Sequence, residues 1–220
     1  MLLGIPVASM RTKLLAQQEP KRLYSEAQTL AEVGFERSWS ATVLERSPLI
    51  VPARRYTFPR EVAGEEDAMA RGALHLIVRP EIGGDFLATC ALGFKHPDMP
   101  TGVWGCPVAR EMCAVAGGYA YIIDTTRPES MTHLSLRPVV ALRELEEQKL
   151  LLFAGFHTVA AWGLVGMAWE SGRLSWEGLR LGSVIGDVLH GFGWDVTTDR
   201  ELPFTLDLRT GQHQGGGFLR

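Results

Sequence analysis

The sequence predicts a mainly β protein made of antiparallel meander sheets, preceded by an N-terminal helical arm. Two features of composition carry the β prediction. From Gly72 onward, 21 of the 24 glycines separate short apolar runs, and glycine supplies the positive φ that tight turns between strands require. Five of the six tryptophans lie between Trp104 and Trp194, where large aromatic side chains can fill the space between stacked sheets.

A third observation is a passage that occurs twice. Each copy has a short apolar strand, a strand carrying Trp-Gly and a last strand of aromatic-x-aliphatic-Asp type; the copies comprise residues 84–94, 103–105 and 121–125, and residues 148–156, 161–163 and 204–208. If the copies are equivalent, Trp104 and Trp162 occupy matching buried positions. Asp124 and Asp207 should then each accept backbone N–H groups and begin a turn after a last strand, rather than serve as acid and base.

The first 71 residues form the predicted arm. Pro20 is a favourable first-turn residue, the segment 21–33 has its apolar residues on one side, and Gly34 can end the resulting helix. An extended segment with several prolines follows this helix. The sequence thus predicts three parts, namely the arm (1–71), a β-meander domain (72–212) and a flexible glycine-rich tail (213–220).

The strand ending from Phe204 to Gly211 nearly matches aromatic-x-aliphatic-Asp-x-x-Thr-Gly. In this respect residues 73–212 resemble the blade repeats of β-propellers. The resemblance implies a scaffold on which ligand or partner sites are grafted. Propellers usually close with four or more blades, whereas the chain has room for two long units or three irregular ones. A partial propeller completed in a homodimer and an open sandwich are therefore both expected alternatives.

Composition excludes several classes of partner. The net charge of −3 gives no basic field for nucleic acid or an anionic membrane. No stretch has the roughly 18 uncharged apolar residues of a membrane span, and the apolar N-terminal residues precede the first positive charge, the reverse of a secretory signal. We therefore expect a soluble cytoplasmic protein.

The three cysteines also bear on cofactors. Cys90, Cys106 and Cys113 are an odd number in a chain without an export signal, which favours reduced, buried thiols. With His96 they would make a zinc set, but that spacing lacks the close ligand pairs of common zinc modules. The sequence predicts no metal and no cofactor.

No catalytic motif is present: the chain lacks G-x-S-x-G, H-E-x-x-H, a P-loop and G-x-G-x-x-G. Two loops nevertheless carry candidate ligand-binding residues, in each case an imidazole near a carboxylate. The candidates are His96, Asp98 and the nearby Trp104, together with His190 and Asp195.

The sequence therefore favours a β-scaffold that binds a small molecule or protein partner and forms a homo-oligomer, rather than an enzyme. The alternative is a small-molecule hydrolase or metal-dependent enzyme. It would use either His96 with Asp98, or His190 with Asp187 and Asp195.

Overall fold

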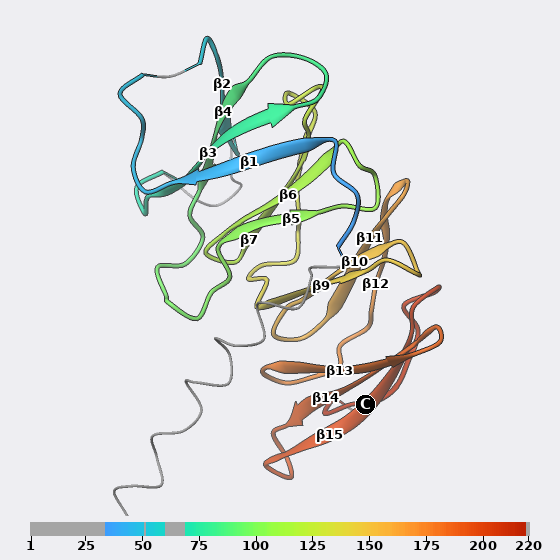
Figure 1. Cartoon of the computed structure of the whole chain (residues 1–220). Helices are drawn as coiled ribbons and strands as arrows, with labels where there is room; N and C mark the ends of the chain where they lie inside the picture. Colours follow the sequence, from blue (N-terminus) through green and yellow to red (C-terminus); the bar gives the residue numbers. More distant parts are fainter. Residues whose placement is uncertain (1–33, 51, 60–68, 219–220) are drawn as a thin grey trace, which may run out of the picture. The chain divides into compact units, whose positions relative to one another are not determined.

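The computed structural model describes residues 34–50, 52–59 and 69–218 (Figure 1). These residues form strands and turns without a helix, so the mainly β prediction is confirmed. No helix in this part of the chain is long and apolar enough to span a membrane. The predicted helix at 21–33 lies outside the described residues.

The strands form four sheets of four strands each, which we name A to D in chain order. Sheet A has the order β1-β3-β4-β2 and contains β1 (Trp39–Leu44), β2 (Arg54–Phe58), β3 (Ala73–Pro80) and β4 (Phe86–Ala91). Strand β2 pairs in parallel with β4, and the other pairs are antiparallel. Two strands that precede residue 72 therefore belong to the first sheet, and the compact unit begins at Gly34.

Sheets B, C and D are simple antiparallel meanders. Sheet B contains β5 (Gly102–Gly105), β6 (Glu111–Ala116), β7 (Tyr119–Asp124) and β8 (Met131–His133). Sheet C contains β9 (Ala141–Leu145), β10 (Leu150–Ala154), β11 (Val159–Gly163) and β12 (Gly166–Glu170). Sheet D contains β13 (Leu179–Ile185), β14 (Val188–Asp195), β15 (Arg200–Asp207) and β16 (His213–Gly215).

The C-terminal segment is part of sheet D. Strand β16 pairs with β15, and the amide of Gly217 donates to the carbonyl of Leu174 (2.8 Å). Both Gly216 and Gly217 are buried. The glycines predicted to form a flexible tail instead allow a close approach, since a Cβ on Gly216 would lie 2.6 Å from the Leu174 carbonyl oxygen.

Consecutive sheets pack face to face through three apolar clusters. Leu76 of sheet A and Tyr121 of sheet B share the first, Phe153 of sheet C joins sheet B in the second, and Phe204 of sheet D joins sheet C in the third. Strands β6, β7, β10 and β11 are buried along almost their whole length, which explains their near-continuous apolar sequences. Four small sheets packed in this way are compatible with blade-like repeats.

The cysteines belong to these clusters. Cys90 lies between sheets A and B, whereas Cys106 and Cys113 lie between sheets B and C, and all three thiols are free and buried. Burial raises the pKa of the Cys90 thiol to about 12. Burial likewise raises the pKa of the other two thiols well above the usual value. They are unreactive packing groups.

The prediction that the two tryptophans occupy matching positions is wrong. The prediction that the two aspartates begin turns is confirmed. Trp104 lies in β5, the first strand of sheet B, whereas Trp162 lies in β11, the third strand of sheet C. Trp162 is buried and Trp104 is half-buried. Asp124 and Asp207 each end the third strand of a sheet and accept a backbone N–H in the turn that follows. The repeated passage had combined strands from neighbouring sheets into one unit.

Candidate functional site

Successive turns in a meander alternate between the two ends of its strands. The same end therefore carries the connections β4–β5, β6–β7, β8–β9, β10–β11, β12–β13 and β14–β15. We name this the loop edge. Backbone hydrogen bonds join its connections from one sheet to the next: Phe94 N to Gly117 O (2.8 Å), Val139 N to Gly118 O (2.8 Å), Leu174 N to His157 O (2.8 Å) and Trp176 N to Trp194 O (2.9 Å). The loops are therefore held together as one continuous surface.

His96 and Asp98 lie in the β4–β5 connection. The amide of Asp98 donates to Nδ1 of His96 (3.3 Å), and the Asp98 carboxylate lies 3.6 Å from the same nitrogen. Both side chains are exposed, at 59% and 86%, so water competes for both groups. The structure thus brings this predicted pair together as a surface pair without a buried environment to activate it.

Strand β14 separates the residues of the second predicted loop. Asp187 precedes the strand and Asp195 ends it, which places them about 26 Å apart at the usual rise per residue. His190 pairs with Thr205 in the middle of the strand, and alternation puts the side chains of His190 and Asp195 on opposite faces. These three residues therefore do not form one site.

Asp195 has a structural role in the β14–β15 turn. Its carboxylate accepts the Thr197 amide (3.0 Å) and the hydroxyls of Thr197 and Thr198 (2.6 Å for the latter). These hydrogen bonds, led by that from Thr198, lower the pKa of Asp195. Within the described ranges, no group of three or more His, Cys, Asp or Glu side chains could hold a metal ion.

Trp104 lies within β5, not in the connection that carries His96 and Asp98. It pairs with Cys113 across β5 and β6 and packs against the cluster between sheets B and C. Its ring contacts its own strand neighbour, since a Cβ on Gly102 would lie 3.2 Å from Cη2. This predicted binding residue thus contributes to the packing of sheets B and C.

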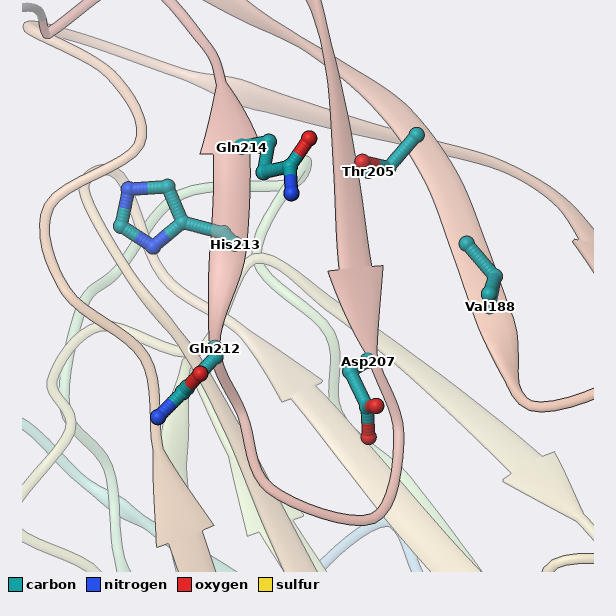
Figure 2. A pocket seen from close by; sticks show the side chains of 6 residues that line it. All are labelled: Val188, Thr205, Asp207, Gln212, His213 and Gln214. Carbon is teal, nitrogen blue, oxygen red and sulfur yellow. The ribbon is translucent and has the colours of Figure 1, made fainter.

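A hollow of about 280 Å³ lies on sheet D, lined by Val188, Thr205, Asp207, Gln212, His213 and Gln214. Figure 2 shows Thr205 and Gln214 on the neighbouring strands β15 and β16, with the His213 ring on the other side of β16. Asp207 is its one carboxylate, and the amides of Arg209 (2.8 Å) and Thr210 (3.1 Å) already bind it. The backbone hydrogen bond from Arg209 is the main cause of the lowered pKa of Asp207. The other lining side chains are polar apart from Val188.

A second hollow of about 280 Å³ lies on the loop edge, and we name it the edge hollow. The β8–β9 connection, the β10–β11 turn and the end of β12 line it with Ser135, Leu136, Arg137, Pro138, Gly155, Phe156, His157, Thr158 and Glu170. The Gly155 amide donates to the Thr158 carbonyl (2.9 Å), which closes the turn that carries Phe156 and His157. Glu170, its one carboxylate, accepts the Thr158 hydroxyl (3.0 Å).

Arg173 lies beside the edge hollow, in the β12–β13 connection. Its guanidinium carbon lies 4.8 Å from the ring centre of Trp176 and 4.6 Å from that of Phe218. Its Nε donates to the Ser175 carbonyl (3.0 Å), and Nη2 lies 3.5 Å from Nδ1 of His157. Two aromatic rings and the carbonyls of Ser175 and Trp176 therefore hold this cation next to the hollow.

Sequence reasoning did not single out Arg137, His157 or Arg173. A local signal exists in the segment 171–178, where Arg173 and Trp176 stand among turn-forming residues. Their convergence could not be read from the sequence, because it depends on how sheets B, C and D pack. Comparison with known proteins finds no match to this chain among protein-family models, curated proteins or solved structures.

Proposed function

We propose that this protein is a β-sheet scaffold that binds another protein through its loop edge. One observation carries the proposal. The exposed aromatic side chains of the described residues are Phe94 (43%), Phe156 (36%) and Trp176 (38%), and all three lie in connections of the loop edge. Exposed aromatic side chains are enriched at protein interfaces, where they supply much of the binding energy.

The rigidity of the loop edge supports this role. The backbone hydrogen bonds between its connections fix the loops before a partner arrives, which lowers the entropic cost of association. His96 and Asp98 belong to the same edge, and their exposure suits contact with a partner more than chemistry in a desolvated site.

Paired surface variants test the proposal. The double variant Phe94→Ser/Phe156→Ser removes two loop-edge aromatics, and Leu164→Ser/Val165→Ser removes exposed apolar groups from the opposite edge. Partners captured by the wild-type chain in cells are identified, and their direct binding to each purified variant is measured. We expect the loop-edge variant to lose binding and the control to keep it. Undiminished binding by a folded loop-edge variant would refute the proposal.

We also infer that the chain forms a homo-oligomer. Sheet D carries Val188 and Phe192 on the face away from the cluster it shares with sheet C, and both are half-buried. Uncovered sheet faces and edges favour association with a second copy. Light scattering should report a mass above 24.2 kDa, and Val188→Lys should reduce it; a monomer at all concentrations contradicts the inference. A cytoplasmic location fits the three free thiols.

A further inference from the structure

We infer that the edge hollow binds an acidic segment of the protein partner through Arg137 and Arg173; this inference rests on the proposed function. Arg137 lines the hollow, and Nη2 of Arg173 lies 3.5 Å from Nδ1 of His157 in the β10–β11 turn, which lines it as well. Two arginines from different sheet connections therefore border the hollow.

Each guanidinium group packs against an aromatic ring before any ligand binds. The guanidinium carbon of Arg137 lies 5.4 Å from the ring centre of Tyr119. Arg173 packs against both Trp176 and Phe218 and is anchored by its hydrogen bond to Ser175. Stacked arginines lose little freedom on binding, and their planar N–H groups match the geometry of a carboxylate.

These cations lack an anion within the described part of the chain. Neither Arg137 nor Arg173 has a carboxylate within 4 Å there, whereas Arg110 and Arg127 both pair with Asp124 and Arg180 pairs with Glu201. No hydrogen bond of Arg137 is formed within these residues, and Arg173 has none through Nη1. A carboxylate oxygen can therefore bind Nη1 of Arg173, or the guanidinium of Arg137, without displacing a hydrogen bond within these residues.

The surroundings favour a peptide carboxylate over nucleic acid or a membrane surface. The chain has a net charge of −3, so its overall field does not attract a polyanion. Glu170 lies at the rim of the hollow, where it would oppose an extended anionic surface. Phe156, which lines the hollow, and Trp176, which packs against Arg173, add exposed apolar area, which suits acidic residues interspersed with apolar ones.

Fluorescence anisotropy with a labelled Glu-Glu-Phe-Glu-Glu peptide tests this inference on the full chain. The matched peptide Gln-Gln-Phe-Gln-Gln measures binding without charge. We expect the acidic peptide to bind more tightly and to weaken as salt is added. Arg137→Gln and Arg173→Gln should each raise its Kd about tenfold or more, because each removes a charge-assisted hydrogen-bonding group. The control Arg55→Gln changes an exposed arginine on β2 and should leave Kd unchanged.

Several outcomes would overturn the inference. Equal binding of both peptides shows that charge is not recognised, and an equal loss in Arg55→Gln shows a nonspecific effect of net charge. If phosphate or citrate displaces the labelled peptide at a concentration equal to that of the peptide, the site binds small free anions and is not specific for an acidic segment. Arg137→Gln decides the result if Arg173→Gln does not fold. If acidic peptides fail while Phe94→Ser/Phe156→Ser still loses the cellular partner, this inference falls and the proposed function stands.

Discussion

Glu144 offers a sharp test of how the sheets are held together. Its Oε2 accepts the amide of Phe35 (2.8 Å), and its Oε1 accepts the amide of Gly105 (2.9 Å) and Nη2 of Arg37 (3.4 Å). One side chain of β9 therefore binds the segment that enters sheet A and the end of β5 in sheet B. Replacing Glu144 with alanine removes the acceptor of two backbone N–H groups at once.

The expected loss follows from these contacts. An unsatisfied buried donor costs about 1–3 kcal/mol. Phe35 and Gly105 are both buried, but the Glu144 side chain is 12% exposed, so water replaces part of what is lost. We expect Glu144→Ala to lower the free energy of unfolding by about 2–4 kcal/mol. Glu144→Gln keeps one carbonyl oxygen as an acceptor and should fall between alanine and wild type.

Urea unfolding followed by tryptophan fluorescence measures this loss. The midpoint should fall for Glu144→Ala, while the dependence on urea concentration stays the same if the fold is retained. Glu147→Ala is the matched control, since this exposed residue occupies the β9–β10 turn. Surface substitutions typically change the free energy of unfolding by no more than about 0.5 kcal/mol. If the free energies of unfolding of Glu144→Ala and Glu147→Ala differ by no more than this, the Glu144 carboxylate does not hold the sheets together.

Three further predictions concern the core and the turns. Trp162→Ala should lower the free energy of unfolding by about 3–5 kcal/mol, because Trp162 is 7% exposed and donates to Glu111 (2.8 Å). Trp104→Ala should lower it by less, because Trp104 is half-buried. Equal losses in urea unfolding would contradict this prediction. Hydrogen bonds lower the pKa values of Asp195 and Asp207. Burial raises the pKa of Asp124, but the hydrogen bonds from Thr126 and Arg110 outweigh this effect and lower it as well. The stabilisation by these carboxylates is therefore present above about pH 4 and is lost as the pH falls through their lowered pKa values. The variant Asp124→Asn should lose less stability in acid than the wild type does. An unchanged dependence of stability on pH would argue against this role of Asp124. Gly216→Val should destabilise sheet D, because φ is +99° and the side chain would meet the Leu174 carbonyl; a wild-type melting temperature would show that residues 213–218 do not pack as described.

Features that depend on nearest neighbours were predictable. Asp124 and Asp207 begin turns because each carboxylate reaches an amide two residues ahead, an interaction set by local geometry. The mainly β fold class could be predicted from the glycines that separate short apolar runs. The burial of the cysteines could be predicted from the apolar residues around them. The edge hollow was not predictable, because Arg137 and Arg173 come from connections in different parts of the chain.

The sequence by itself determined that this chain forms β-strands and where several of its turns begin, since strand alternation and turn chemistry act over a few residues. The tertiary structure alone decided which strands belong together. Strand β2 pairs with β4, about 30 residues away along the chain, Trp104 and Trp162 fall in non-equivalent strands, and residues 213–215 complete sheet D. Those outcomes depend on long-range pairing and packing of similar apolar strands, whose local patterns do not distinguish one partner from another.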